Sequence, residues 1–502
     1  MLTPERIKSL IESDMSSKKK QYAMIGQRYY EGDHDIRRYR VFFIDKDDNV
    51  REDTTKSNVR ICRPFFAELV DQSAQYMLSG KDAFVRSDNP ELQAWLDTYF
   101  NDDRKFKAEL YKILIGCEIK GDEYAFAYKT EKGRTSFMCA DSLGVVEVRA
   151  RETDDNCDYI IYWYVERINK ENQEIKRIEV WDDKQTTFFK QVSNGPIILD
   201  TEAKPNPRPH SLYTRDGEEG YYAENYGRIP FFRLDNNRKR VSSLRAVKDH
   251  IDDYDLMNCG LSNNIQDASE VLVVVRGFAD DDIDDFVQNL KAKKHVGTPT
   301  AEDNVEYRTV EIPVEARKVK MEIDEKNIYK DGRGVNLEAL KDSSATVSMG
   351  VRTAYFSLDM KCDAKVFELE SFMDGLVQLV LDEVNKEQGT AYQLSDIYYT
   401  FERESISNAQ ENAQIKLLEA QTRQAEITTL LNLESRLGNE VFMELVCDQL
   451  ELDYDDIKDK LPKPEEESDP YSAGAARGAL SDIIPEDEAP EAGNDDGGDL
   501  IE

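Results

Sequence analysis

Two stretches decide the fold of this chain: RYYEGDHDI at residues 28–36 and SNVRICRPFFAELVDQSAQYMLSG at residues 57–80. The first predicts a helix that ends at Tyr30 and is followed by a Gly-Asp turn. The second predicts an apolar helix over residues 62–79. Between them, the polar segment 39–53 alternates in hydropathy and turns at acidic residues, which predicts a β-hairpin. Nothing in the block has the pattern of a catalytic site.

In the rest of the chain, the sequence pattern predicts a change from helices to strands and back to helices. Residues 123–232 are rich in aromatic and β-branched residues between Gly, Asp and Asn turns, which predicts a meander of antiparallel strands. Two shorter strands are predicted at 270–277 and 304–312, and another at 396–403. The expected fold class is therefore α+β with several domains. Helices are predicted over 4–30, 89–120, from Ser242, 358–388 and 405–460, and a polar helix over 314–333 after Pro313. The segment 201–228 is rich in Pro, Gly and Tyr, which predicts a loop.

Length and charge set limits on function. At 502 residues, two to four structural units are expected. The formal net charge is −35, and residues 462–502 carry 13 acids against two bases. That end, rich in Pro, Glu, Asp, Gly and Ala, is expected to be disordered. The remaining net charge of −24 should repel nucleic acid over most of the surface, because DNA is itself densely anionic.

Several classes of protein are excluded by missing motifs. The only Gly-Lys pair, at Gly80, lacks the other residues of a Walker A loop, so the chain is not itself a P-loop ATPase. The four histidines have no ligand spacing, and the seven cysteines form no C-x-x-C pair. The longest purely apolar run, 271–275, is far too short to span a membrane. We expect no enzyme activity, no cofactor and no membrane partner.

Two acidic patterns are weak metal candidates. The hairpin turn at Asp45, Asp47 and Asn49 begins like a calcium loop but lacks the required Gly and Glu, so a solvated turn is favoured. The run from Asp280 to Asp285 is better explained as the first turn of a helix. A metal-dependent nuclease that uses this run stays a remote alternative.

A basic helix and a loop of small residues remain as candidate functional segments. The helix 314–333 gathers six cationic residues in an acidic chain, and it is read either as a face with Glu/Lys pairing or as points that contact a polyanion. The loop 336–352 contains small, permissive residues and is read as a connector or as a mobile functional loop.

The order of these elements resembles the portal proteins of tailed bacteriophages, specifically the SPP1-like group. The early block and the helix from Ser242 to Asn258 carry the likeness, and the order helix, insertion, helix, loop, long helix extends it to about residue 460. The matching residues are Tyr29, Tyr30, Gly32, His34, Asp35, Ile36, Asn58, Phe65, Phe66, Leu69, Val70, Asp71, Gln72, Tyr76, Leu78, Gly80, Leu244, Val247, Lys248, Ile251, Asp252 and Tyr254.

The resemblance implies a dodecameric ring around a DNA channel at one vertex of a phage head, built from wing, stem, clip and crown parts. The implied parts are a wing at 1–235, a first stem helix at 236–268, a clip at 269–313, a second stem helix at 314–335, a tunnel loop at 336–352, a long wing helix and strand at 353–400, a helical crown at 401–461 and an acidic tail at 462–502.

The resemblance also implies partners and sites. The expected partners are further copies of the chain, double-stranded DNA, the terminase ATPase, scaffolding and major capsid proteins, and an adaptor that completes the head. The expected location is the virion, after assembly in the bacterial cytoplasm. A minor head protein without a tunnel is the main alternative. The candidate tunnel-loop residues are Asn336, Leu337, Leu340, Lys341, Asp342, Ser343, Ser344, Thr346, Val347 and Ser348; the tunnel-facing basic candidates are Lys318, Lys320, Lys326, Lys330 and Arg333; the clip docking candidates are Asp280, Asp281, Asp284, Asp285, Lys291, Lys293 and Lys294.

Overall fold

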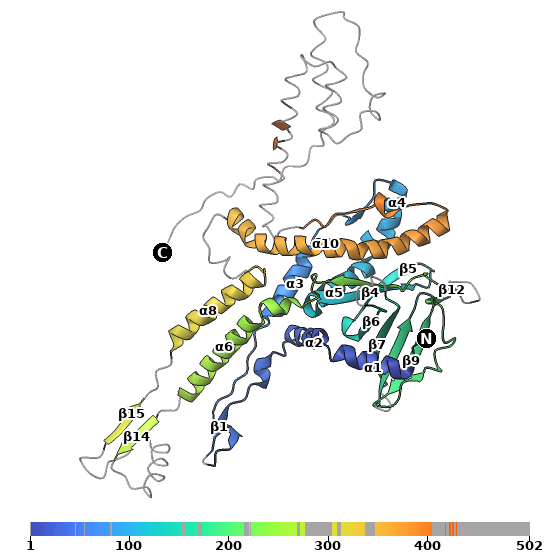
Figure 1. Ribbon diagram of the computed structural model, residues 1–502. Helices are drawn as coiled ribbons and strands as arrows, with labels where there is room; N and C mark the ends of the chain where they lie inside the picture. The colour runs from blue at the N-terminus through green and yellow to red at the C-terminus, as the bar shows by residue number, and fades with distance from the viewer. Residues whose placement is uncertain are drawn as a thin grey trace, which may run out of the picture. The chain divides into compact units, whose positions relative to one another are not determined.

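The computed structural model divides the chain into two units, Met1–Ser407 and Asn408–Glu502. The described helices and strands belong to the first unit (Figure 1). In the second, only isolated helical positions between 417 and 428 are described, so the expected crown and acidic tail lie almost wholly outside the described residues. The described stretches of the first unit are 2–45, 47–54, 56–80, 83–151, 157–168, 173–214, 220, 222–268, 272–276, 304–308, 313–336 and 347–403.

The N-terminal segment forms two helices, α1 (Pro4–Met15) and α2 (Lys18–Tyr30). The continuous helix predicted over 4–30 is therefore wrong at its middle. The reason is local: Ser17 adopts an extended backbone, and its hydroxyl accepts a hydrogen bond from the Lys20 N–H at 3.2 Å, which is the geometry of an N-cap.

The next helices are α3 (Phe65–Met77), α4 (Pro90–Leu96) and α5 (Arg104–Lys120). A π-helical turn, Asp97–Asn101, separates α4 from α5, so the helix predicted over 89–120 is interrupted. Helix α5 ends at Gly121, whose φ of 102° lies in the left-handed region that glycine tolerates.

The predicted meander of antiparallel strands is confirmed. One sheet has five strands in the order β10-β9-β8-β7-β6, and a second has three in the order β13-β4-β5. The segment 201–228, predicted as a loop, contains a short hairpin of β11 (Ser211–Tyr213) and β12 (Tyr222–Glu224). The sheet strands are β4 (Asp122–Lys129), β5 (Thr135–Ala140), β6 (Val145–Val148), β7 (Tyr159–Ile168), β8 (Gln173–Trp181), β9 (Thr186–Val192), β10 (Ile198–Leu199) and β13 (Phe231–Asp235).

The long helix α10 (Val347–Gln388) packs on the three-stranded sheet and on α3. It begins well before the predicted residue 358, so the end of the segment predicted as a loop, 347–352, is helical. Buried Tyr355 extends the core contacts of the helix toward its N-terminus, because its ring lies 5.5 Å from the ring of Tyr76 on α3. Such packing stabilises a helix where local apolar spacing is weak. The strand predicted at 396–403 is only β16 (Tyr398–Tyr399), paired with β3 (Val85–Arg86).

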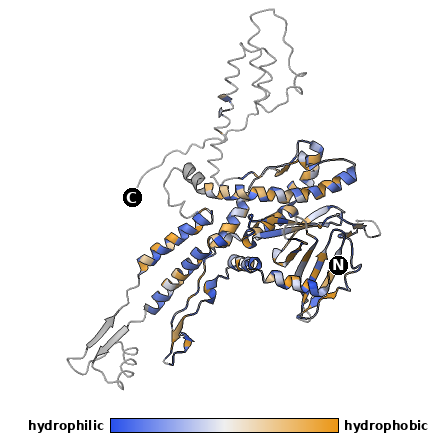
Figure 2. Ribbon diagram, viewed as in Figure 1, coloured by the Kyte–Doolittle hydropathy of each residue, from blue (hydrophilic) through white to orange (hydrophobic). Residues whose placement is uncertain are grey.

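The predicted pair of helices around a strand-containing insertion is confirmed. Helix α6 (Lys248–Ala268) and helix α8 (Val314–Asp331) pack on each other, and β14 (Leu272–Arg276) pairs with β15 (Asn304–Arg308) between them in sequence. The predicted hairpin of the early block is β1 (Phe42–Ile44) with β2 (Val50–Glu52). Figure 2 shows hydrophilic and apolar residues mixed along both α6 and α8.

Candidate functional site

An aromatic cluster holds the α6–α8 helix pair against α3. The ring of Phe65, at the start of α3, meets Tyr254 of α6 at 4.9 Å and Tyr329 of α8 at 6.0 Å, both edge to face. Ile251 and Ile328 are fully buried in the same cluster. Because edge-to-face pairs are favoured geometries for buried rings, this cluster fixes the N-terminal half of α6 and the C-terminal end of α8 against α3.

Charged side chains also join the two helices. Lys320 of α8 forms ion pairs with Asp253 of α6 and with Asp324, which is buried within α8. The hydrogen bonds to Asp253 and Asp324 raise the pKa of Lys320 above its ordinary value. His250 Nδ1 lies 3.7 Å from Asp324 Oδ1, and His250 Nε2 lies 3.4 Å from Asp331 Oδ2. Lys320, a predicted tunnel-facing residue, is thus engaged between the helices.

The other four basic candidates differ from Lys320. Lys318, Lys326 and Lys330 are exposed, and none forms an ion pair with another described residue. Arg333 follows α8 with a φ of 54° and lines a cleft of about 570 Å³ between α8 and α10. Lys318, Lys326, Lys330 and Arg333 are therefore exposed on the described surface, unlike Lys320.

The residues of the early block meet α6 through buried polar contacts. His34 and Asp255 are both fully buried, and His34 Nδ1 lies 2.6 Å from Asp255 Oδ2. The ring of His34 stacks on Tyr29 at 4.5 Å, and the Tyr29 hydroxyl donates a hydrogen bond to Asp252 of α6. Burial raises the pKa of Tyr29, so this hydroxyl stays protonated. The block therefore positions α6.

A second set of contacts, between the segment 57–63 and α6, has a regular spacing. The segment 57–63 runs antiparallel to α6 (Figure 1). Every second N–H in it donates a hydrogen bond to an α6 side chain, and each acceptor lies one helical turn closer to the N-terminus of α6 than the one before. We call this set of contacts the 57–63 ladder. Sequence reasoning missed it, although a stripe of acceptor side chains every fourth residue of α6 is visible in the sequence. The donor and acceptor pairs are Ser57 with Asp267 at 3.1 Å, Val59 with Asn263 at 2.6 Å, Ile61 with Cys259 at 3.1 Å and Arg63 with Asp255 at 3.2 Å.

Most of the other predicted site residues lie outside the described residues. Of the tunnel-loop candidates, Asn336 is described in full, with its amide donating to Glu325 at 3.1 Å, while Val347 and Ser348 are placed only as the start of α10. The seven clip candidates, Asp280 to Lys294, and the loop residues 337–346 are not described. Their roles remain predictions.

Neither a metal-ligand cluster nor a thiol with a lowered pKa is found among the described residues. Among them, no group of three or more His, Cys, Asp or Glu side chains could hold a metal ion. Burial raises the pKa of the Cys117 thiol to about 12 and that of Cys362 to about 11, so neither is a ready nucleophile near neutral pH. The described part of the chain also contains no helix that is long and apolar enough to cross a membrane.

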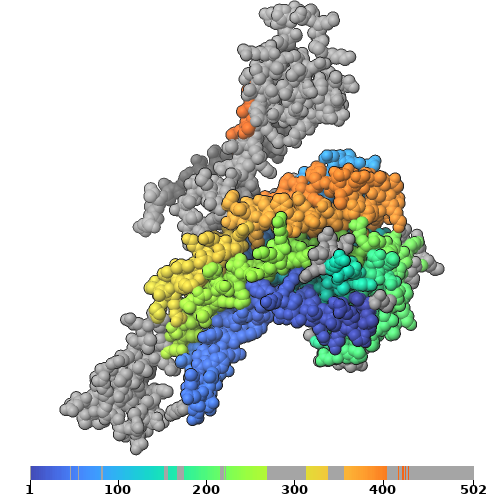
Figure 3. Space-filling view, viewed as in Figure 1, coloured from blue at the N-terminus to red at the C-terminus, as the bar shows by residue number. Residues whose placement is uncertain are grey.

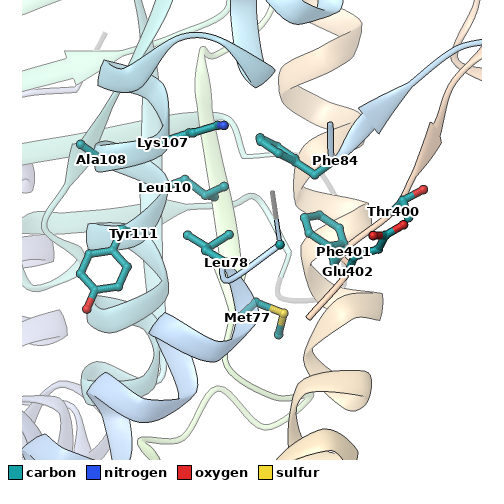
Figure 4. A pocket seen from close by; sticks show the side chains of 11 residues that line it. Met77, Leu78, Phe84, Lys107, Ala108, Leu110, Tyr111, Thr400, Phe401 and Glu402 are labelled. Carbon is teal, nitrogen blue, oxygen red and sulfur yellow. The ribbon is translucent and has the colours of Figure 1, made fainter. Parts of the chain in front are cut away.

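One apolar pocket was not predicted. It has a volume of about 350 Å³ and lies between α3, α5 and the segment after β16, with Met77, Leu110 and Phe401 among its walls (Figure 4). Lys107 is the cationic residue in its lining, with Nζ 6.0 Å from the centre of the Phe84 ring. Thr400 and Glu402, from the segment after β16, are further polar residues of the lining.

Comparison with known proteins gives the family. The family described as "Phage portal protein, SPP1 Gp6-like" matches residues 11–443. The portal protein of Bacillus phage SPP1 is 24% identical over 339 residues, which covers 67% of this chain and 65% of that protein, slightly less than two thirds of its length. The portal protein of Clostridium phage phiCD119 is 23% identical over 431 residues, which covers 82% of this chain and 88% of the relative.

A likeness to a solved structure is weaker. A chain from the neck of a native GTA particle, computed with C12 symmetry, has a TM-score of 0.38 and 13% identity, and the likeness covers 76% of this chain and 89% of that chain. At this TM-score, the likeness supports no conclusion about assembly. The match to the family covers most of the chain and confirms the resemblance found in the sequence. The chain belongs to the SPP1 Gp6-like family of phage portal proteins.

Proposed function

We propose that this protein forms a dodecameric ring around a channel for double-stranded DNA at one vertex of a phage head. The family match over residues 11–443 is the observation that carries this proposal. The family is a structural one, which fits the expectation that the chain is not an enzyme. DNA enters through the channel during packaging and leaves through it at infection, and the ring is the base on which the head–tail connection is built.

The described architecture supports a division of labour along the chain. The α6–α8 pair would form the stem, the insertion that contains β14 and β15 would form the clip, and the helices and sheets on either side in sequence would form the wing. The clip would dock the terminase ATPase during packaging and an adaptor afterwards, in keeping with the missing Walker A loop. Scaffolding and major capsid proteins would contact the ring in the virion. Assembly would take place in the bacterial cytoplasm.

The charge of the chain suits a channel that DNA must pass without sticking. The net charge of −35 disfavours phosphate contacts over most of the surface. Against this background, Lys318, Lys330 and Arg333 would supply sparse, weak contacts with the DNA, together with the loop 337–346. Lys320 is left out of this set because it is held in ion pairs between the helices. Lys326 is left out because it stands beside the exposed apolar side chains of Val319 and Ile323.

The ring itself is tested by negative-stain microscopy and mass photometry of the purified full-length chain. The expected result is a ring-shaped particle with a central hole and a mass close to that of a dodecamer. Particles that stay monomeric at every concentration, or that form solid assemblies, would contradict the proposal and favour a minor head protein without a tunnel.

The DNA contacts are tested by changing Lys318, Lys330 and Arg333 together to glutamine. We expect packaging rate or DNA retention to change several-fold, because phosphate contacts dominate non-specific affinity for DNA. The measurements are the rate of DNA uptake into proheads and the length of DNA retained per particle. A shortened 337–346 loop forms a second arm, for which we expect an altered packaged length.

The matched control changes three exposed lysines away from α6 and α8, namely Lys8, Lys18 and Lys184, to glutamine. This control alters the net charge by the same amount and should leave packaging unchanged. Equal behaviour of the two triple variants would remove these residues from the channel while leaving the ring proposal intact.

A further inference from the structure

The β1–β2 hairpin exposes an unusual amount of apolar surface. The register pairs Phe42 with Glu52 and Ile44 with Val50, so Phe42, Ile44 and Val50 share one face of the two-stranded ribbon. These three side chains are 59%, 69% and 70% exposed. An isolated two-stranded hairpin is marginally stable in water, and three exposed apolar side chains on one face make it a surface that another element should cover.

Helix α8 carries a second exposed apolar patch. Val319 and Ile323 lie one turn apart and are 51% and 50% exposed, on the side of α8 that faces away from α6. The inward side is identified by Lys320, which reaches Asp253, and by buried Ile328. The two patches are therefore separate surfaces of one chain.

The two patches flank α6 on different sides. In Figures 1 and 3 the hairpin segment and α8 lie on either side of α6. The hydrogen bonds of the 57–63 ladder and the ion pairs with α8 use different faces of α6, in agreement with this view. Figure 2 shows apolar positions in both the hairpin and α8. Two different patches on opposite sides of α6 suit a head-to-tail contact, in which one patch of each copy meets the other patch of the next copy. Such contacts close into a ring when the rotation between copies allows it.

Opposite charges also lie beside the two patches, although Glu315 and Glu322 of α8 are exposed near its patch as well. The hairpin turn exposes Asp47 and Asp48, and neither forms an ion pair with another described residue. On α8, exposed Lys326 stands one turn beyond Ile323 and likewise has no ion pair within the described part of the chain. An acidic turn beside one apolar patch and a lysine beside the other would fix the register of a contact between them.

We propose that the apolar face of the hairpin, formed by Phe42, Ile44 and Val50, packs on Val319 and Ile323 of α8 in a second copy of this chain. This inference rests on the ring proposed above and names the surface that joins its neighbours. Lys326 belongs to this contact between copies, next to the acidic hairpin turn. Because each copy gives one patch and receives the other, the contact repeats around the ring.

The test uses two full-length variants, Ile44→Glu and Ile323→Glu. Each places a carboxylate at one half of the contact, so the association constant at each junction should fall on the order of 100-fold. Each variant alone should be monomeric by mass photometry. A mixture of the two should form dimers and nothing larger, because the intact hairpin of one variant can meet the intact α8 of the other at a single junction.

The control is Phe43→Glu, which puts the same charge on the opposite face of the same strand and should still form rings. Circular dichroism of each variant checks that the fold is kept. Rings that persist in both Ile44→Glu and Ile323→Glu overturn this contact but leave the proposed function standing. A mixture of the two variants that stays monomeric has the same meaning. Rings that form normally but fail to enter capsids overturn it as well and point to a capsid partner. A wild-type chain that never forms rings overturns the proposed function itself.

Discussion

Replacing Asp255 by alanine is expected to release the segment 57–63 and the Tyr29–His34 turn from α6. Asp255 is fully buried; one carboxylate oxygen lies 2.6 Å from His34 Nδ1, and the other accepts the Arg63 N–H at 3.2 Å. Alanine would remove this acceptor from the buried His34 ring and from the half-buried Arg63 N–H, at a cost of about 3 kcal/mol. The amide of Arg63 should then exchange its hydrogen on the order of 100-fold faster.

Hydrogen exchange followed by mass spectrometry of the peptide that covers residues 57–65 measures this effect. Asp249→Ala is the matched control, because Asp249 is an exposed residue on the same helix, and its loss should leave the exchange unchanged. Asp255→Asn should fall between the two, because its amide oxygen can still accept the Arg63 N–H. Equal exchange in Asp255→Ala and in wild type would show that the buried contact does not hold the segment.

Replacing Gly121 by alanine is expected to have an effect of similar size on stability. Two costs add at this position, the left-handed backbone at a φ of 102° and the lack of space for a Cβ atom. An added Cβ would lie 2.5 Å from the Arg240 carbonyl oxygen, which belongs to the loop that leads into α6. The left-handed backbone costs about 1–2 kcal/mol and overpacking a similar amount, so a loss of about 3 kcal/mol in the free energy of unfolding is expected.

Gly32→Ala separates the two costs. Gly32 also has a left-handed φ, at 76°, but an added Cβ would meet nothing within 4 Å. This variant should lose only the backbone part, about 1 kcal/mol. Thermal unfolding followed by far-ultraviolet circular dichroism compares the two variants, and equal losses would show that the loop at Arg240 yields to the new side chain without cost.

The fold was predictable from sequence where a local pattern carries the signal. The strands of the two larger sheets alternate in hydropathy, α6 has apolar residues at helical spacing and polar α8 follows Pro313, so these elements were found in the right order. The short β11–β12 hairpin was missed. The break between α1 and α2 was missed because a single serine cap, Ser17, decides it. The start of α10 was missed because the packing of Tyr355 on Tyr76 joins residues that are distant in sequence.

The candidate site was less predictable for a related reason. Sequence placed six cationic residues on or just after α8 but could not show which face of α8 meets α6, so engaged Lys320 and exposed Lys318 were treated alike. The 57–63 ladder has no periodic apolar pattern in its outer segment, so nothing in that segment indicates its partner. Charge and hydrophobic periodicity describe one helix or segment at a time, whereas the ion pairs of Lys320 and the 57–63 ladder each join two elements.

The extended segment and the helix of the 57–63 ladder have slightly different repeat lengths. Two residues of an extended chain advance about 6.6 Å, whereas four residues of an α-helix advance about 6.0 Å. The mismatch would accumulate to about 2 Å over three steps, whereas ordinary N–H···O distances span only about 0.5 Å. The segment and the helix must therefore adjust slightly for all four described bonds to form. A single-residue insertion between Ser57 and Arg63 would turn the remaining N–H groups away from the helix, whereas an insertion of two residues would restore their direction. The length of this segment is therefore constrained in steps of two.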